Sequence, residues 1–219
     1  MIPELSRFEL RFPSPHSADE NGIVAYGGDL IPSRIMLAYR SGIFPWYSSG
    51  DPILWWSPDP RFILHLDDFK LRKSLKKRLK YFEIKIDSAF DQVLHECAMI
   101  ERPGQHGSWL LPEMVEAYAQ LHALGYAHSV EAYQEGRLVG GLYGVVVGGV
   151  FCGESMFARV SDASKAAFAF LVEHLKKQGF DFIDAQVPTA HLRSLGAVAI
   201  HRNDFLSLLE QSRDKEVTF

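Results

Sequence analysis

The sequence predicts a mixed α/β fold built in layers, and three observations support this prediction. From about residue 62 onward, patterns typical of helices alternate with patterns typical of strands. Three consecutive strand patterns are joined by turns short enough for hairpins, which predicts antiparallel pairing. The stretch before residue 62 differs, because it is rich in proline, glycine, serine and aromatic side chains. We therefore predict a small irregular N-terminal domain over residues 1–62 and a larger layered domain over residues 63–219.

The elements follow from hydrophobic period and from end signals. Ser33 and Ser88 are expected to cap the beginnings of helices, and Gly42 and Gly125 are expected to end helices. The expected helices cover residues 33–41, 88–101, 112–124, 161–178 and 203–212. The expected strands cover residues 81–87, 127–134, 138–147, 149–157 and 180–185. This order resembles the N-acetyltransferase-like fold of acyl-transfer enzymes, a likeness that does not specify the acyl donor.

Composition excludes several classes of protein. The longest apolar runs are too short to span a membrane, and the first residues lack the pattern of a signal peptide. The two cysteines, Cys97 and Cys152, support neither a disulfide framework nor a CxxC metal site. The nine histidines show no spacing typical of metal ligands, so we expect no metal. We expect a cytoplasmic protein, and a monomer because no interface stripe is recognisable.

A strongly basic segment, KLRKSLKKRLK, covers residues 70–80 and contains no acidic residue, in a chain whose net charge is −4. Leu71, Leu75 and Leu79 share one face at helical spacing, which leaves the cations on the other faces. Such a segment is either the solvated face of an amphipathic helix or a contact for a polyanion, and its charge density favours phosphate contacts. The residues expected to contact phosphates are Lys70, Arg72, Lys73, Lys76, Lys77, Arg78 and Lys80.

Several unusual oligopeptides occur together in the chain: NGIVAYGGD at 21–29, GIFPW at 42–46, WWSPDPR at 55–61, FCGESMF at 151–157 and IDAQVP at 183–188. In this order and spacing they resemble the leucyl/phenylalanyl-tRNA–protein transferase family, from about residue 5 to about residue 205. The resemblance implies transfer of leucine or phenylalanine, sometimes methionine, from aminoacyl-tRNA to proteins that begin with lysine or arginine, which marks those proteins for degradation. It also makes tRNA the polyanion expected at the basic segment. The acceptor preference comes from the resemblance alone.

Aminoacyl transfer makes light demands on side-chain chemistry. The ester of an aminoacyl-tRNA is already activated, so amide formation needs neither ATP nor a metal, and we expect no cofactor; no GxxxxGK[ST] motif occurs. Asp184 and Gln186 lie two residues apart near the end of an expected strand and should point to the same side. Gln186 would accept a hydrogen bond from the attacking amine while Asp184 orients its amide, which are the roles that the resemblance implies. The alternative is an aspartate that caps a turn.

Glu154 is the third expected catalytic residue. It lies among aromatic residues in an expected strand, where an unpaired carboxylate is costly to bury. Its partner is either the α-ammonium group of the donor amino acid or a structural cation, Arg159 or Lys165. The resemblance favours the substrate role.

The resemblance also implies residues that bind the donor. Trp46 and Trp109 lie in expected loops, where an indole is available to stack on the terminal adenosine of tRNA. Tyr39 and Phe151 join them around that adenosine and the donor amino acid. The side chains expected to form the apolar donor pocket are Leu142, Met156, Phe168, Leu171, Leu175 and Ile183. Each of these also fits an ordinary core position.

Three other functions compete with this hypothesis. A coenzyme-A-dependent N-acetyltransferase would hold pyrophosphate on a glycine-rich turn that opens a helix, whereas residues 159–165 contain no glycine and include Asp162. A non-catalytic tRNA-binding module would need the basic segment and the aromatic residues but would leave Asp184 and Gln186 without a role. Arginyl transfer to acidic N-termini is disfavoured by the apolar donor pocket.

Overall fold

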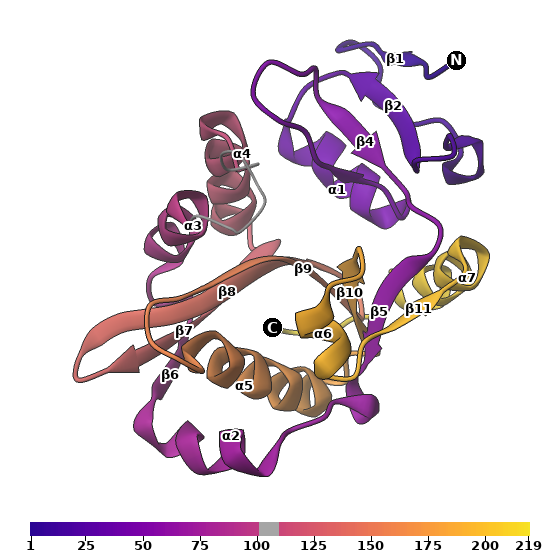
Figure 1. Ribbon diagram of the computed structural model, residues 1–219. Coiled ribbons are helices and arrows are strands. Elements are labelled where there is room, and N and C mark those ends of the chain that lie inside the picture. The colour runs from indigo at the N-terminus through magenta and orange to yellow at the C-terminus, as the bar shows by residue number, and fades with distance from the viewer. Residues whose placement is uncertain (101–109) are drawn as a thin grey trace.

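The strands of residues 1–100 and 110–219 form two sheets. One group of strands is β1 (Glu4–Leu5), β2 (Ile23–Gly27), β3 (Phe44–Pro45) and β4 (Leu54–Trp56). The other is β5 (Arg61–His65), β6 (Glu83–Ile86), β7 (Ala127–Gln134), β8 (Arg137–Val147), β9 (Val150–Ala158), β10 (Phe182–Gln186) and β11 (Val198–Ile200). A computed structural model, which describes residues 1–100 and 110–219, arranges them in the orders β1-β2-β4-β3 and β11-β5-β10-β9-β8-β7-β6 (Figure 1).

Helices flank the larger sheet. The α-helices are α1 (Pro32–Arg40), α2 (Lys73–Arg78), α3 (Phe90–Met99), α4 (Pro112–Ala123), α5 (Ala163–Gln178), α6 (Ala190–Ser194) and α7 (Arg202–Ser212). Short 3₁₀ helices cover η1 (Pro15–Ser17), η2 (Leu66–Asp68) and η3 (Leu79–Tyr81). The mixed α/β prediction is confirmed. Within the described ranges, none of these helices has the length and apolar character needed to cross a membrane.

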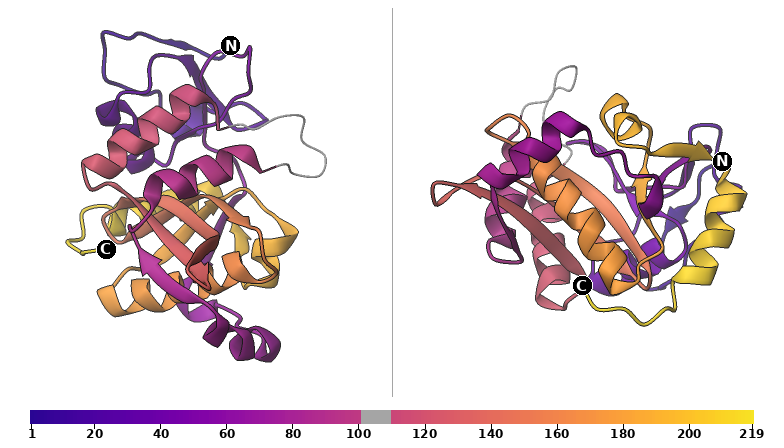
Figure 2. Two further views of the ribbon diagram at one scale, coloured as in Figure 1. Left: turned by 90° about the vertical axis from the view of Figure 1, so that its left-hand side faces the viewer. Right: turned by 90° about the horizontal axis from the view of Figure 1, so that it is seen from below.

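The larger sheet has a core on each face because successive side chains of a strand point in opposite directions. Tyr143 and Val145 of β8 pack with α3 and α4, whereas their neighbour Leu142 packs with α5. Figure 2 shows α5 on one side of this sheet and α3 and α4 on the other, beneath the N-terminal part of the chain. Tyr39 of α1 and Tyr118 of α4 belong to the same buried cluster as Tyr143. Side chains from the N-terminal part therefore reach the larger sheet.

The N-terminal part is more regular than predicted, since a four-stranded sheet and α1 form it. Short strands of two to five residues carry too little periodicity to be recognised in a turn-rich sequence. The prediction that Ser33 caps α1 is wrong, because the helix begins one residue earlier at Pro32 and its N-cap is Ile31. The fixed φ of proline suits the first helical position, where its missing N–H is no loss.

The prediction that Ser88 caps the next helix is also wrong. Ala89 is the N-cap of α3, and the Ser88 hydroxyl instead donates to Glu131 Oε2 over 3.0 Å. The carboxylate of Glu131 is fully buried and also accepts a bond from Ser129. A buried carboxylate requires such donors, and this need decides where Ser88 points.

β9 and β10 are parallel neighbours in the larger sheet, and the sheet opens between their ends. These strands pair at three positions, from Phe182 with Val150 to Asp184 with Cys152. Beyond Asp184, the pairing of β10 with β5 shifts register, and Gln186 takes the left-handed backbone conformation with φ of 60°. The bulge turns β10 away from its neighbour and leaves a space between their ends.

Candidate active site

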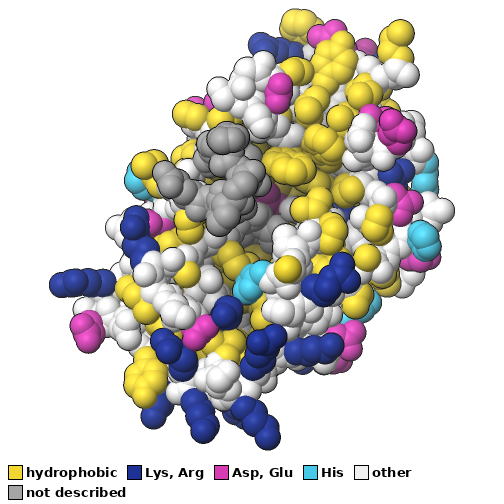
Figure 3. Space-filling model, in the orientation of Figure 1, with side chains coloured by type: hydrophobic (Ala, Val, Ile, Leu, Met, Phe, Trp, Pro, Cys, Tyr) yellow, Lys and Arg dark blue, Asp and Glu magenta, His cyan; other side chains and the backbone are white. Residues whose placement is uncertain are grey.

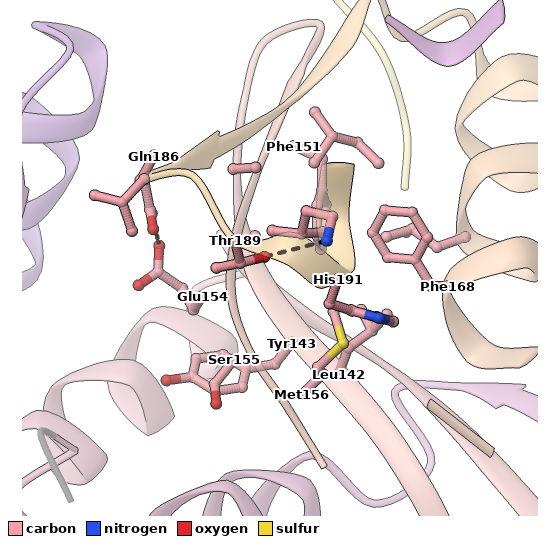
Figure 4. A pocket seen from close by; sticks show the side chains of 16 residues that line it. Leu142, Tyr143, Phe151, Glu154, Ser155, Met156, Phe168, Gln186, Thr189 and His191 are labelled. Atoms are coloured by element: carbon pink, nitrogen blue, oxygen red, sulfur yellow. Dashed lines mark hydrogen bonds between the residues drawn. The ribbon is translucent and has the colours of Figure 1, made fainter. Parts of the chain in front are cut away.

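A cavity of about 320 Å³ lies where β9 and β10 part (Figure 4). Its apolar wall comes from β8, β9, α5 and α6, and its polar end comes from β9 and β10. The lining residues are Leu142, Tyr143, Phe151, Gly153, Glu154, Ser155, Met156, Phe168, Leu171, Ile183, Ala185, Gln186, Val187, Thr189, His191 and Leu192. Figure 4 shows Glu154 and Gln186 meeting on one side, across from Phe151, Phe168 and Met156. An apolar pocket with a few convergent polar groups is the usual form of a small-molecule site.

Glu154 is the centre of the polar end. Its Oε1 accepts hydrogen bonds from the Tyr39 hydroxyl at 2.7 Å and from Gln186 Nε2 at 2.8 Å. Its Oε2 accepts a bond from the Tyr118 hydroxyl at 2.9 Å. The oxygens of Tyr39 and Tyr118 lie 2.7 Å apart. The side chain was predicted to pair either with substrate or with Arg159 or Lys165, and the structure pairs those two cations with Glu96 and Asp162 instead.

Burial raises the pKa of Glu154 to about 7, since the carboxylate leaves water for an apolar site. The hydrogen bonds from Tyr39, Tyr118 and Gln186 act in the opposite direction, and the nearby charge of Asp184 adds to the increase. Burial together with Glu154 also raises the pKa values of the phenols of Tyr39 and Tyr118 well above their usual range. Near neutral pH the glutamate is therefore the group of the three that changes protonation. Strongly shifted carboxyl groups in a pocket are frequent at catalytic sites.

The Gln186 side chain is fixed at one end. Its Nε2 donates to Glu154, which leaves the carbonyl Oε1 as the acceptor of this amide. Within the residues that the structure describes, no protein donor occupies this oxygen. The left-handed backbone at this position is uncommon for a side chain other than glycine, asparagine or aspartate, and such outliers cluster at functional sites.

Asp184 acts on the backbone rather than on the amide of Gln186. Its two oxygens form a bidentate ion pair with Arg61 at 2.8 and 2.6 Å, and Oδ1 also accepts the backbone N–H of Gln186 at 3.0 Å. Both side chains are almost fully buried, and the carboxylate does not line the cavity. The expectation that Asp184 orients the Gln186 amide directly is thus corrected: Glu154 holds the amide, and Asp184 holds the bulge.

Arg61 connects three parts of the fold around this ion pair. Its guanidinium lies 4.8 Å from the ring centre of Phe44 and 4.3 Å from that of Phe205, and it donates to the carbonyl of Gly42. The sequence hypothesis did not assign Arg61 a role. A buried arginine in a strand becomes recognisable once its acidic partner is known, and that partner lies 123 residues away.

Most of the predicted donor-pocket residues line the cavity. Leu142, Met156, Phe168, Leu171 and Ile183 belong to its wall, as does Phe151. Leu175 does not line the cavity; it packs in the core one helical turn beyond Leu171. Tyr39 meets the site from α1 through its bond to Glu154.

The two predicted tryptophans differ in what the structure provides. Trp46 is partly exposed, lies 5.5 Å from the ring of Trp56 and does not line the cavity. Trp109 lies outside the described residues.

Several site residues were missed by the sequence hypothesis. Tyr118 bonds to Glu154, and Thr189 and His191 of the segment after β10 line the cavity. Tyr118 lies on the buried face of a helix, where sequence alone does not distinguish it from a core residue. The short helix α6, which carries His191, also gave too short a periodic pattern to be predicted.

The basic segment lies on the edge of the molecule away from the N-terminal part. Its helix, α2, runs from Lys73 to Arg78, and Leu75 is its buried residue. All seven cations are exposed, and dark-blue side chains gather along this edge in Figure 3. Arg78 pairs with Asp162 at 3.2 Å. This acidic residue is distant in the sequence, so the composition of the segment did not indicate the pair.

Comparison with known proteins relates this site to a family. A family model described as leucyl/phenylalanyl-tRNA protein transferase matches residues 63–210, and the model of the N-terminal domain of that transferase matches residues 28–59. A leucyl/phenylalanyl-tRNA–protein transferase of Sulfurimonas denitrificans is 58% identical over 96% of this chain and 92% of its own length. The corresponding protein of Flavobacterium johnsoniae is 50% identical over 92% of this chain and 96% of its own length.

Among solved structures, an aminoglycoside acetyltransferase from an uncultured soil metagenomic sample has a TM-score of 0.40 at 15% identity, covering 65% of this chain and 96% of that chain. The structure of L-PGS from Bacillus licheniformis has a TM-score of 0.41 at 15% identity, covering 62% of this chain and 48% of that chain. At this level of similarity neither structure bears on the substrate. The family assignment rests on the sequence matches, which extend over nearly the whole chain and include both sides of the cavity. By these matches, the chain belongs to the leucyl/phenylalanyl-tRNA–protein transferase family.

Proposed function

We propose that this protein transfers leucine or phenylalanine from aminoacyl-tRNA to the N-terminal lysine or arginine of acceptor proteins and so marks them for degradation. The observation that carries the proposal is the cavity between β9 and β10, which is apolar on its walls and has Glu154 and Gln186 at one end. An apolar side chain of the donor fills such a space, and its reacting ester then lies at the polar end. Family membership supports both the donor and the class of reaction.

The chemistry of this transfer depends on position. The ester is activated before it binds. Holding two reactants in attack geometry lowers the activation barrier by roughly 7–11 kcal/mol. In this proposal the Gln186 carbonyl accepts a hydrogen bond from the attacking α-amine, and Glu154, which lines the same cavity, holds the amide through its Nε2. Asp184 and Arg61 are positioning residues, because they hold the bulge that presents Gln186.

A transfer assay tests the proposal. The protein is incubated with radiolabelled Leu-tRNA and a peptide that begins with arginine, and label is expected on the peptide. The same peptide with an acetylated N-terminus is the matched control, since it has no free α-amine. Absence of label from the free peptide would reject the proposal, and transfer from acetyl-CoA to the same peptide would replace it with acetyl transfer.

The donor pocket gives a prediction with a built-in control. Leu171→Ala removes side-chain atoms from the cavity wall and so enlarges the cavity. Leu175→Ala removes the same atoms one helical turn away, at a side chain that does not line the cavity. Both are expected to lower the free energy of unfolding by about 2–5 kcal/mol, as buried Leu→Ala changes do. We expect Leu171→Ala alone to change the ratio of kcat/KM for Phe-tRNA over Leu-tRNA, by roughly 10-fold or more, because pocket contacts of this size discriminate by that much.

The ratio is measured in competition assays at a temperature where both variants are folded. An unchanged ratio in Leu171→Ala, or an equal change in Leu175→Ala, would remove the donor side chain from this cavity.

We also propose that the basic segment contacts the phosphates of tRNA. Lys73, Lys76 and Lys77 are exposed on α2, and no ion pair within the described parts of the chain engages them. Replacing all three by glutamine should weaken binding of every tRNA alike. The slope of log affinity against log salt should flatten by about 0.7–0.9 for each phosphate that the variant no longer neutralises.

The control for this prediction carries the same change in net charge elsewhere. Arg11, Lys85 and Arg137 are exposed and lie outside the basic segment, so that their replacement by glutamine should leave the slope closer to that of the unmodified protein. Equal slopes for the two triple variants, measured by filter binding over a range of salt, would return the segment to a solvated helix face.

A further inference from the structure

The hydrogen bonds around Glu154 require more protons than an ionised carboxylate leaves available. Four short contacts join Tyr39 to Glu154, Tyr118 to Glu154, Gln186 to Glu154 and Tyr39 to Tyr118, at 2.7 to 2.9 Å. When the carboxylate is an anion, the two hydroxyl protons point to its oxygens and Gln186 donates one more. Three protons then serve four contacts. The two tyrosine oxygens face each other at 2.7 Å with no proton between them.

A neutral carboxyl group satisfies all four contacts without any movement of heavy atoms. The proton on Oε2 donates to Tyr118, the Tyr118 hydroxyl donates to Tyr39, and Tyr39 donates to Oε1, which also accepts the Gln186 bond. After a proton arrives on Oε2, rotation of the carboxyl O–H and of the Tyr118 hydroxyl converts one arrangement into the other. These three side chains, which we call the Glu154 ring, therefore accept a proton with little reorganisation.

The groups that face Glu154 leave it as the one that titrates. They are Tyr39 from α1, Tyr118 from α4, and Asp184 and Gln186 from β10. Cys152 lies on β9 with Glu154, and burial raises the pKa of its thiol well above its usual range. No lysine or arginine pairs with Glu154 within residues 1–100 and 110–219. Burial holds the pKa of Glu154 at about 7, close to that of an ideal catalyst of proton transfer at neutral pH.

We propose that Glu154, held in this ring by Tyr39 and Tyr118, takes the proton that the attacking nitrogen loses when the amide bond forms. The proposal rests on the proposed transfer activity and adds a proton acceptor to it. With one bond from Tyr118, Oε2 keeps a lone pair free to receive that proton.

The reaction balances as a shuttle. The neutral acceptor amine attacks the ester carbon, the N–C bond forms, and the nitrogen becomes positively charged with two hydrogens. One of these protons passes to Glu154, and the other stays on the amide nitrogen. The C–O bond to the ribose then breaks as the carbonyl re-forms, and the leaving oxygen receives the proton from Glu154, which returns to its anion after each cycle.

The ring is tested first in the free protein. The carboxyl signal of Glu154 is followed against pH by infrared difference spectroscopy or by carbon-13 NMR, and is identified by its loss in Glu154→Gln. Titration at a pKa near 7 is expected, whereas a value in the ordinary range of a glutamate, about 4.3, would overturn the proposal. This measurement needs no activity and no folded variant other than the one used for assignment.

The second test separates a proton acceptor from an anchor for the ammonium group of the donor. Single-turnover transfer is measured for the unmodified protein and for Glu154→Gln, with Phe-tRNA and with a donor that carries a hydroxyl in place of its α-amine. If Glu154 accepts a proton from the acceptor amine, the variant loses roughly 10²–10⁴-fold in rate with both donors, as general bases usually contribute. In the unmodified protein the rate falls as pH drops through about 7, and in the variant this dependence on the glutamate is absent.

Three outcomes overturn the proposal in distinguishable ways. A loss that vanishes with the hydroxyl donor makes Glu154 the partner of the donor ammonium group. An equal loss in Tyr133→Phe, a tyrosine on β7 whose hydroxyl contacts Ser88 and not the ring, would show a general effect on the sheet. A failure of the unmodified protein to transfer any label rejects the proposed function itself, while the spectroscopic titration still reports on the ring.

Discussion

Replacement of Arg61 by leucine is expected to lower the free energy of unfolding by about 3–5 kcal/mol, because it leaves the buried carboxylate of Asp184 without its partner. The guanidinium supplies two bonds to Asp184 and lies between the rings of Phe44 and Phe205. The Asp184 carboxylate is 2% exposed, so water cannot replace those bonds. The loss should appear as a lower midpoint in urea, with the slope of the transition unchanged.

Arg159→Leu is the matched control. Arg159 forms an ion pair with Glu96 at 2.6 Å, but its side chain is 62% exposed. The same substitution there should change the free energy of unfolding by less than about 1 kcal/mol, as surface pairs usually do. A loss at Arg61 no larger than that at Arg159 would mean that the buried pair is not a main support of the fold around β10.

Shortening Gln186 to asparagine is expected to reduce kcat roughly 10²-fold while the affinity for aminoacyl-tRNA changes little. The amide is retained, but the side chain is one methylene shorter, so the carbonyl retreats from the attacking amine and the bond to Glu154 is broken. Displacement of a positioning group by about 1 Å costs that much in a reaction that depends on attack geometry. The substitution adds no backbone strain, because asparagine tolerates the left-handed conformation found at this position.

The measurement combines single-turnover transfer with equilibrium binding of the charged tRNA. Gln178→Asn at the exposed end of α5 makes the same chemical change away from the site and should leave both quantities unaltered. A rate for Gln186→Asn close to that of the unmodified protein would show that the transfer rate does not depend on the exact position of the Gln186 carbonyl. Loss of binding in parallel with loss of rate would instead make Gln186 part of the donor site.

The long elements of the larger sheet could be predicted because their periodicity is local. The strand predicted over residues 127–134 matches β7, and the helix predicted over 161–178 differs from α5 by two residues at its start. The missed elements are short or depend on distant partners. β5 and β11 pair with each other and β5 with β10, so their hydrogen bonds join parts of the chain more than a hundred residues apart.

The candidate site divides in the same way. The sequence led to Glu154, Gln186 and most of the apolar wall, since they occur in unusual oligopeptides and in regular patterns. It did not reveal Arg61 or Tyr118, and it assigned Leu175 to a pocket that this side chain does not line. Whether a helix side chain faces a cavity or the core depends on what packs against that face.

The sequence by itself determined the layered α/β class and the family, and it supplied candidate residues for an aminoacyl transfer, because local patterns and rare oligopeptides carry this information. The tertiary structure decided the partners. In the folded chain Asp184 forms an ion pair with Arg61, and Arg78 forms one with Asp162. Glu154 accepts hydrogen bonds from Tyr39, Tyr118 and Gln186. A buried charge takes the partner that the packed chain brings to it, and that choice depends on contacts between distant segments, which no local pattern encodes.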